Sequence, residues 1–245
     1  MSQTIILHDP ESGDFFYKEA IKTLRANIQF SGRKRRKILL TSVFSGEGKS
    51  DISFHLAAEI AQMGKKVLLV DADIRNSVFL TRYDVNKTVV GLSEYLSGQV
   101  DNPNDIVCAT NYKDLFVIPA GAYAPNPSEM LSDDTFAKMI DSAAKAFDYI
   151  IIDSPPLGQV IDAAMIANIC DGAVLVMESG AISYRVAQKV KMQLERTGCR
   201  ILGVVLNKVD RNAGGTYGKY GKYGKYGKYG KYGYGYGYGE SKKTS

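Results

Sequence analysis

A chain of 245 residues with 45% hydrophobic content can bury one substantial core, so we expect a single domain with further segments outside it. The three cysteines, Cys108, Cys170 and Cys199, are far apart and form no CxxC pair, which argues against a disulfide framework or zinc cluster and favours a reducing cytoplasm. The net charge of +5 is only mildly basic, no apolar run approaches the roughly 18 residues that span a bilayer, and the N-terminus lacks a signal-peptide pattern, so we expect a soluble protein unless a partner recruits it.

The first segment, residues 1–35, is expected to be a helical appendage that precedes the main fold. Its helix is predicted around residues 16–29, where Leu24 and Ile28 lie four residues apart on one side. Glu19 and Lys22 are spaced to form an i,i+3 ion pair, so the plain interpretation of this stretch is a solvated helix face.

The body, residues 36–211, alternates short apolar runs with longer amphipathic stretches. The apolar runs, interpreted as strands, are Ile38–Thr41, Val67–Val70, Leu115–Ile118, Tyr149–Ile152, Ala173–Met177 and Ile201–Leu206. The amphipathic stretches, interpreted as helices, include Ile52–Met63, Asp134–Phe147 and Ser183–Arg196, whereas the stretch between Arg75 and Pro127 gives no clear pattern. Strands that are apolar throughout suit a sheet covered on both faces. We therefore predict an α/β fold with a doubly wound, mostly parallel sheet, whose ligand lies beyond the carboxyl ends of the strands.

A glycine-rich segment, SVFSGEGKSD, follows the first of these strands and leads into a helix that begins near Ser50. Glycines let backbone N–H groups turn toward a phosphate, Lys49 adds a positive charge, and the Ser50 hydroxyl can bind magnesium. The pattern GxxxxGK[ST] is not fully met, because Val43 stands where its first glycine would be, and an accidental glycine turn is the plain alternative. We interpret the segment as the phosphate loop of a P-loop NTPase, with nucleotide contacts from Ser45, Gly46, Glu47, Gly48, Lys49, Ser50 and Asp51.

Polar side chains follow three other strands at their predicted carboxyl ends. Asp71 and Asp73 come after one strand and Asp153 after another; either site alone is as easily a turn-initiating aspartate. In a parallel sheet these ends share an edge with the phosphate loop, and clustered carboxylates need a cation, so Mg²⁺ bound to nucleotide phosphates is the expected partner. Asn207 ends the last strand, where its amide suits an adenine ring or a plain turn.

The chain ends in a tail, residues 212–245, of a different composition. It contains TYG, five KYG triplets and three YG pairs, and no aliphatic residue follows Ala213. Frequent glycine and the lack of core residues predict disorder, and the absence of proline from the repeat argues against collagen. Residues 217–245 carry seven lysines and one glutamate, a charge of +6, whereas the rest of the chain has 24 basic and 25 acidic residues. This asymmetry favours an interaction or regulatory tail.

With these residues assembled, the chain resembles the bacterial tyrosine kinases of capsule and exopolysaccharide systems, a branch of the deviant-Walker ATPases that includes the MinD and ParA group. The resemblance covers roughly residues 15–210 and extends to the tyrosine-rich tail. SVFSGEGKS is similar to the family's first Walker motif, SxxPGEGKS, with Ser45 in place of proline. VDAD at 70–73 resembles its second Walker motif, and IIIDSPP at 150–156 resembles its Walker B motif.

The resemblance implies a protein-tyrosine kinase that uses ATP and Mg²⁺ to phosphorylate its own tail in trans. Lys49 would neutralise the β- and γ-phosphates, Asp71 would assist the incoming hydroxyl, and Asp73 and Asp153 would organise the metal and its waters. The implied metal ligands are Ser50, Asp71 and Asp153. The implied acceptors are Tyr217, Tyr220, Tyr223, Tyr226, Tyr229, Tyr232, Tyr234, Tyr236 and Tyr238.

The N-terminal helix resembles the family's ExxRxxR oligomerisation motif, with Glu19, Lys22 and Arg25 at its three charged positions. Lys22 replaces the first arginine and lacks the planar guanidinium fork, so a bidentate contact there would be weaker.

Three further departures are Asp51, His55 and Ser77, where the family often has Thr, Asn and Pro. A carboxylate at Asp51 would either weaken phosphate binding or add a favourable negative charge at the helix N-terminus.

The resemblance also implies partners and a location. The partners are the cytoplasmic end of a transmembrane chain-length regulator that activates the kinase, further copies of the chain in a head-to-tail ring, and an opposing tyrosine phosphatase. The kinase would lie in the cytoplasm, at the inner face of the membrane, and regulate capsular or exopolysaccharide synthesis or export. Each phosphate adds roughly −1.5 to −2 charges, so about three to four phosphates would cancel the tail's charge. Full modification would dissolve an oligomer built by tail capture.

Two other functional classes stay open at this point. The alternating cations and aromatics of the tail suit single-stranded nucleic acid or another partner if the body is a ParA-like ATPase switch, although nucleic acid fits the neutral body poorly. A positioning ATPase of the MinD type would need a C-terminal amphipathic membrane helix, which this glycine-rich tail cannot form.

Overall fold

The computed structural model describes residues 3–9, 14–32, 34–85 and 87–210. The chain divides into two units, Met1–Lys208 and Val209–Ser245, and the fold below is that of the first unit. The nine tyrosines of the predicted tail lie outside the described residues.

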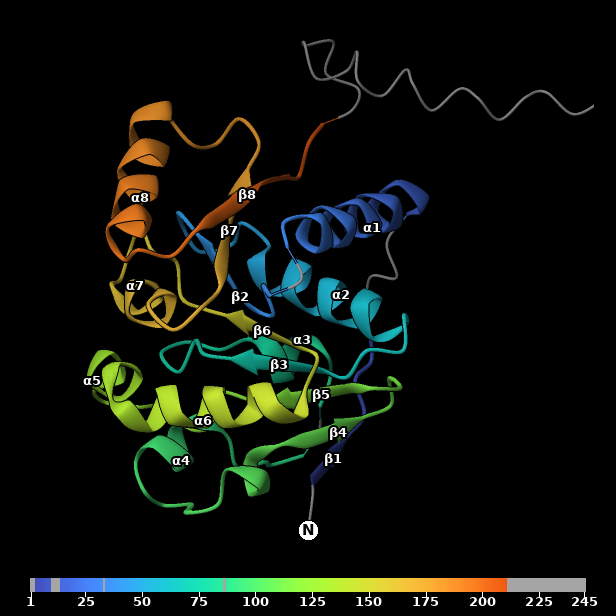
Figure 1. Ribbon diagram of the computed structural model, residues 1–245, viewed down its shortest axis with the longest axis vertical. Coiled ribbons are helices and arrows are strands. Elements are labelled where there is room, and N and C mark those ends of the chain that lie inside the picture. Colours follow the sequence, from blue (N-terminus) through green and yellow to red (C-terminus); the bar gives the residue numbers. More distant parts are fainter. Residues whose placement is uncertain (1–2, 10–13, 33, 86, 211–245) are drawn as a thin grey trace, which may run out of the picture. The chain divides into compact units, whose positions relative to one another are not determined.

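An eight-stranded sheet runs through the first unit, in the part of the chain that the structure describes (Figure 1). Its strands are β1 (Gln3–Ile5), β2 (Lys37–Ser42), β3 (Val67–Asp71), β4 (Cys108–Thr110), β5 (Leu115–Ile118), β6 (Tyr149–Asp153), β7 (Gly172–Glu178) and β8 (Ile201–Asn207). They lie in the order β1-β4-β5-β3-β6-β2-β7-β8, and only the β4–β5 pair is antiparallel. The prediction of an α/β fold with a mostly parallel sheet is confirmed.

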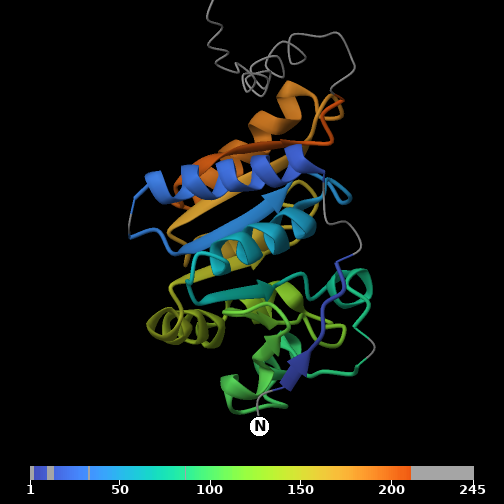
Figure 2. The same ribbon diagram turned by 90° about the vertical axis from the view of Figure 1, so that its right-hand side faces the viewer.

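Helices cover both faces of the sheet (Figure 2). They are α1 (Phe15–Phe30), α2 (Lys49–Ala61), α3 (Phe79–Arg82), α4 (Leu92–Leu96), the 3-10 helix η1 (Pro103–Ile106), α5 (Pro127–Ser132), α6 (Asp134–Ala146), α7 (Asp162–Ala167) and α8 (Tyr184–Arg196). One buried cluster joins the sheet to α1, α2 and α3 and includes Phe54 and Phe79. The other joins it to the remaining α-helices and includes Phe136 and Leu194. None of the helices in the described ranges is long and apolar enough to cross a membrane.

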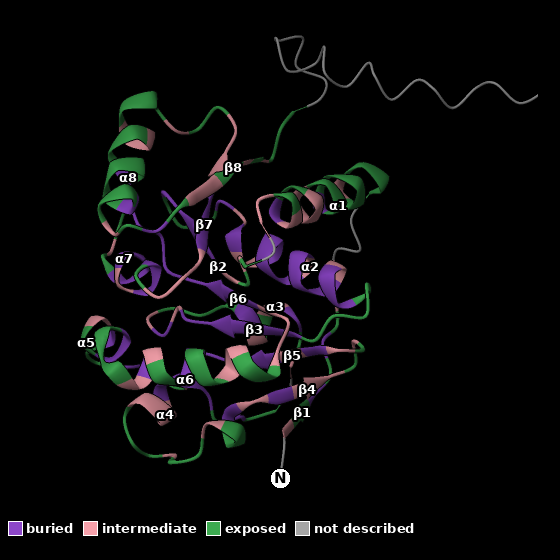
Figure 3. Cartoon of the chain, viewed as in Figure 1, coloured by how far each residue is buried: buried purple, intermediate pink, exposed green. Residues whose placement is uncertain are grey.

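The burial of the strands follows their place in the sheet (Figure 3). Strands β2, β3 and β6 are buried almost throughout, as expected for parallel strands covered on both faces. Strand β8 lies at the edge and leaves Val204 and Leu206 partly exposed. The central strands therefore form a rigid base whose carboxyl ends position the polar side chains of the next section.

Two parts of the chain contain elements that the sequence did not predict. Residues 3–5 form strand β1, which pairs with β4, and Ile5 and Leu7 are buried, so the N-terminal segment contributes a strand as well as helix α1. The stretch after Arg75 holds α3, α4, η1 and β4. These elements have three to five residues, too few for an apolar period to be recognised.

Candidate nucleotide site

The glycine-rich segment connects β2 to α2. Gly46 and Gly48 adopt φ values of +83° and +88°, a backbone region that favours glycine. A Cβ atom at Gly48 would lie 2.2 Å from Nδ2 of Asn207, so a larger residue there would displace that side chain. Gly48 caps α2 without a side-chain hydrogen bond, which leaves the first N–H groups of the helix available to an anion.

Lys49 is buried at the start of α2, close to acidic side chains from two strands. Its Nζ lies 3.5 Å from Oδ2 of Asp153 and 3.6 Å from Oδ2 of Asp73. It also donates a hydrogen bond to Oγ of Ser50 at 3.2 Å. Burial alone would lower the pKa of Lys49, but the charges of Asp153, Asp73 and Asp71 outweigh burial and raise it. The ammonium is therefore protonated at neutral pH, as a phosphate-binding group must be.

Asp71 and Asp153 are direct neighbours on the paired strands β3 and β6, and both are buried. Burial and the nearby charge of Asp153 raise the pKa of Asp71 to about 7. Burial also raises the pKa of Asp153, against the opposing effect of Lys49. Ser77 donates a hydrogen bond to Oδ2 of Asp71, and Ser53 donates one to Oδ1 of Asp153 at 3.2 Å. A bound cation would strongly stabilise the charged form of two buried, adjacent carboxylates.

These groups line or border a cavity of about 180 Å³. Its lining residues are Ser42, Ser45, Gly46, Gly48, Lys49, Ser50, Asp51, Asp71, Asp73, Asn76, Ser77, Val78, Phe79, Arg82 and Pro156. The structure therefore brings together most of the residues that the sequence assigned to nucleotide and metal. Glu47, Asp153 and Asn207 are outside this set.

The donor set fits a phosphate group bound to Mg²⁺. Uncapped helix N–H groups and a buried lysine suit the anion, and the Ser50 hydroxyl with adjacent carboxylates suits the cation. No three His, Cys, Asp or Glu side chains of the described ranges form a ready-made metal cluster. Magnesium commonly takes one or two carboxylates and completes its shell with water and phosphate oxygens.

Glu47 faces the loop's own backbone. Its Oε2 accepts hydrogen bonds from the N–H groups of Val43 and Phe44, both at 2.7 Å, and its Oε1 accepts one from the N–H of Glu178 at 3.1 Å. The side chain is 2% exposed. These contacts tie the phosphate loop to the end of β7, a role different from the nucleotide contact that the sequence predicted for Glu47.

Asn207 also contacts the loop. Its Nδ2 donates a hydrogen bond to the carbonyl oxygen of Glu47 at 2.9 Å, and its own carbonyl accepts one from the N–H of Ser179 at 2.9 Å. The side-chain amide of Asn207, which the sequence predicted to suit an adenine ring, thus already donates a hydrogen bond to the backbone beside Gly48. The end of β8 helps to shape the phosphate loop.

Several contacting side chains were not singled out from the sequence. Gln159 accepts hydrogen bonds through Oε1 from the N–H and the hydroxyl of Ser45, at 3.2 and 2.7 Å. Arg75 forms a two-point ion pair with the buried Asp162, at 2.5 and 3.0 Å, and links the segment after β3 to α7. The available signal was that Arg75 lies two residues after Asp73, whereas the partners of Arg75 and Ser45 are distant in the chain.

The three charged residues predicted for oligomerisation lie on α1. Glu19 and Lys22 form the expected i,i+3 pair, with Nζ and Oε1 2.7 Å apart, and both side chains are about half exposed. Arg25 instead lies against α2, with Nε 3.4 Å from Oε1 of Glu59. Two of the three residues are thus presented on the surface of this unit, and the third joins the two helices.

The chain is similar to several known proteins in sequence and in fold. A family model described as an AAA domain matches residues 35–197. The tyrosine-protein kinase CpsD of Streptococcus agalactiae serotype III (strain NEM316) is 48% identical over 201 residues, covering 82% of this chain and 86% of the relative. The solved kinase domain of the Escherichia coli tyrosine kinase ETK has a TM-score of 0.75 at 31% identity, covering 89% of this chain and 80% of that one. The septum site-determining protein MinD of Pyrococcus horikoshii OT3, solved with Mg-ADP, has a TM-score of 0.63 at 27% identity, covering 73% and 72%.

Proposed function

Because this chain belongs to the bacterial tyrosine-protein kinases that are built on an AAA domain, we propose that it transfers phosphate from ATP to the tyrosines of its own C-terminal tail. The observation that carries the proposal is the buried Lys49, held among Asp71, Asp73 and Asp153 at the uncapped start of α2. A second observation is the sequence of the tail, which repeats a lysine-tyrosine-glycine triplet. The first supplies a phosphate site, and the second supplies acceptors.

The residues of the site divide the work of phosphoryl transfer. Lys49 neutralises the terminal phosphates, and the backbone N–H groups of Gly46 and Gly48 bind their oxygens. Ser50, Asp71 and Asp153 would hold Mg²⁺, which when bound neutralises the charge that develops on the phosphate oxygens. Asp73, in the same cluster, would help to organise the waters of the metal.

Asp71 has a second part in the proposed reaction. The tyrosine oxygen forms a bond to the γ-phosphorus, the bond from that phosphorus to the bridging oxygen breaks, and ADP leaves. The proton of the tyrosine hydroxyl passes to the carboxylate of Asp71. Glu47 and Asn207 keep the loop in shape, since their side chains form hydrogen bonds with backbone groups of the loop.

Each of the three segments of the chain has its own role in the proposed reaction. We propose residues 1–35 as the oligomerisation segment, 36–211 as the kinase domain and 212–245 as the substrate tail. The acceptor tyrosines are those from Tyr217 to Tyr238, modified in trans by a neighbouring copy. Neighbours would meet through Glu19, Lys22 and Arg25 of α1, in a ring or another oligomer.

The proposed setting is the cytoplasmic face of the cell membrane. By resemblance to the bacterial tyrosine kinases, we propose that a membrane chain-length regulator recruits and activates this one. A tyrosine phosphatase would oppose it, and the cycle would regulate capsular or exopolysaccharide synthesis. Nucleic acid is not a proposed partner.

The test is intact-mass analysis and phosphopeptide mapping after incubation of the full chain with Mg-ATP. The wild type should gain phosphate on the tail tyrosines, whereas Lys49→Met should gain none, because it keeps the length of the side chain and removes its charge. Circular dichroism and thermal unfolding check that the variant is folded. ATP consumption without phosphotyrosine, even with a cytoplasmic regulator fragment present, would contradict the kinase proposal and favour an ATPase switch.

A further inference from the structure

Asp51 connects the candidate nucleotide cavity to the N-terminal helix. Its Oδ2 accepts a hydrogen bond from the hydroxyl of Tyr17 on α1 at 2.5 Å. Its Oδ1 accepts one from Nη2 of Arg82, at the end of α3, at 2.7 Å. Asp51 and Arg82 both line the nucleotide cavity, whereas Tyr17 lines a second cavity, of about 360 Å³, beside α1 and α2. Asp51, which is 8% exposed, therefore contacts one side chain at each of the two cavities.

The same contacts explain how a carboxylate can stand beside the phosphate loop without repelling a bound phosphate. Asp51 follows Ser50 in the first turn of α2, where an unpaired negative charge would repel a bound triphosphate. Arg82 supplies a balancing charge, and Nδ1 of His55, one helical turn further along, lies 3.5 Å from Oδ1 of Asp51. Asp51 and His55 are two of the positions at which the sequence departs from the family pattern, and in the structure their side chains lie next to each other.

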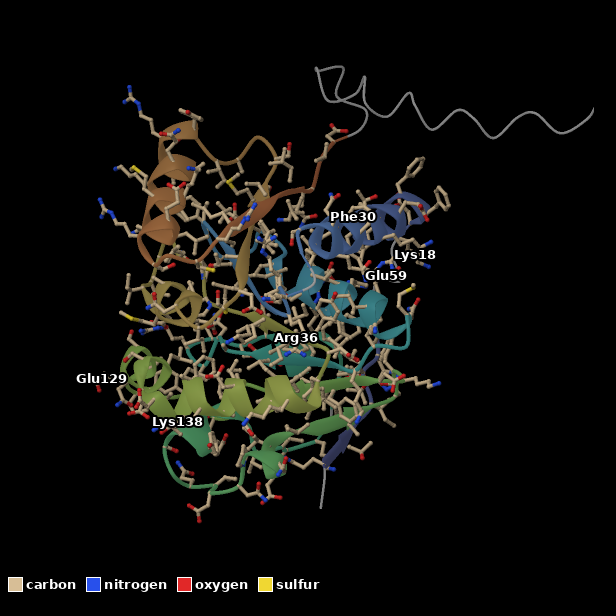
Figure 4. All side chains as sticks on the ribbon, viewed as in Figure 1. Lys18, Phe30, Arg36, Glu59, Glu129 and Lys138 are labelled. Atoms are coloured by element: carbon tan, nitrogen blue, oxygen red, sulfur yellow. The ribbon has the colours of Figure 1, made fainter. Side chains whose placement is uncertain are left out.

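The second cavity shows how α1 and α2 meet on this side of the unit. Four residues of α1 line it, namely Tyr17, Lys18, Ile21 and Lys22. On the other side it is lined by Phe54, His55, Ala58 and Glu59 of α2 and by Gln62, which caps that helix. Figure 4 labels Lys18 and Glu59 at this junction. The hydroxyl of Tyr17 is part-buried beside it, so the bond to Asp51 is shielded from water and holds the N-terminal end of α1 against the start of α2.

We propose that Asp51 is a positioning residue that couples the packing of α1 to the nucleotide site, by holding Arg82 at the cavity while Tyr17 holds Asp51. The inference rests on the proposed function only in assigning the cavity to a nucleotide. Because α1 also carries the surface pair Glu19 and Lys22, a contact made there by another copy of the chain alters nucleotide binding through Tyr17 and Asp51.

The test compares two hydroxyl deletions at the same cavity by calorimetric titration with Mg-ADP. Tyr17→Phe removes the donor to Asp51. Tyr112→Phe is the matched control, because Tyr112 lines the second cavity and is not among the donors to Asp51 in the described ranges. We expect Tyr17→Phe to raise the dissociation constant about five-fold, within the usual span of coupling between sites, and Tyr112→Phe to leave it unchanged.

A double-mutant cycle isolates the contact. Tyr17→Phe should have no further effect on the dissociation constant in an Asp51→Ala background, because the acceptor is already gone. Asp51→Val, which also lacks an oxygen acceptor and fills more of the site, replaces that background if the Asp51→Ala chain is not folded. An undiminished effect of Tyr17→Phe in either background would overturn the inference.

Reciprocity provides a readout that does not depend on catalysis. Mg-ADP should slow amide hydrogen exchange in α1 of the wild type and should not do so when Asp51 is replaced. Equal dissociation constants for the two tyrosine variants, with α1 exchange indifferent to Mg-ADP, would overturn the coupling and leave the kinase proposal intact. The expected binding pattern without tail phosphorylation would contradict the kinase and support the coupling. A wild-type chain that binds no Mg-ADP would overturn the assignment of the cavity and this inference with it.

Discussion

Individual side chains beside the phosphate loop stabilise the conformation of the loop through hydrogen bonds with its backbone. Glu47 is a buried carboxylate whose oxygens accept three backbone N–H groups. Three such bonds replace the hydrogen bonds to water that a buried carboxylate loses. The loop conformation that exposes N–H groups to a phosphate therefore depends on a residue that need not contact the phosphate itself.

We expect Glu47→Gln to lower the free energy of unfolding by about 2 kcal/mol, because hydrogen bonds to a charged acceptor contribute roughly 1.5–3 kcal/mol and an amide cannot replace both oxygens. The Mg-ADP dissociation constant should rise with it. Urea unfolding measures the first effect and calorimetry the second. Glu195→Gln is the matched control, since Glu195 forms an exposed ion pair with Lys191 on α8. A change in affinity with no change in stability would show instead that Glu47 contacts the nucleotide directly.

At the scale of elements, the contact between α1 and α2 includes a charge that titrates. Burial alone would lower the pKa of His55, but its hydrogen bond to Asp51 and the charges of Asp51 and Asp9 outweigh burial and raise the pKa to about 9. The neighbouring hydroxyl of Tyr17 stays neutral, because burial and Asp51 raise its pKa, and Arg82 stays charged. His55 is thus a cation in the folded chain at neutral pH.

This gives the stability of the unit a defined pH dependence. The folded pKa of about 9 lies above the unfolded value of roughly 6.5, so the stabilisation is complete below about pH 6.5 and is lost as the pH rises through 9. We expect the free energy of unfolding to fall between these values in the wild type, and to fall less in His55→Asn. Denaturant unfolding at a series of pH values measures the difference. Parallel profiles for the two proteins would show that His55 is not charged in the fold.

At the scale of the whole molecule, charge is divided between a neutral body and a tail of +6. Phosphates of roughly −1.5 to −2 charges each would neutralise the tail after about three to four modifications and invert it after nine. An oligomer held by capture of cationic tails in neighbouring active sites would then lose its attachment.

We therefore expect the full chain to pass to a smaller species, by light scattering, as tail phosphorylation proceeds in Mg-ATP. The Lys49→Met chain, incubated identically, should keep its starting mass. A phosphatase added afterwards should restore the larger species of the wild type. The same oligomer before and after complete phosphorylation would show that the tail does not hold the copies together.

The sequence by itself determined the class of fold and most of the chemistry of the site. Strands such as Val67–Asp71 are apolar throughout, and this pattern is local, so their burial in a parallel sheet was predictable. The placement of Lys49, Asp71 and Asp153 at one edge followed, because the carboxyl ends of parallel strands share that edge.

Only the tertiary structure decided which neighbours these residues have. Glu47 contacts Glu178, Asn207 contacts Glu47, and Tyr17 contacts Asp51, in each case across dozens of residues of sequence. The local sequence around a carboxylate or amide is the same whether the side chain binds a ligand or forms hydrogen bonds with the backbone. The choice depends on which donors the fold brings within hydrogen-bonding distance, and that is set by the order of the strands and the packing of α1 on α2.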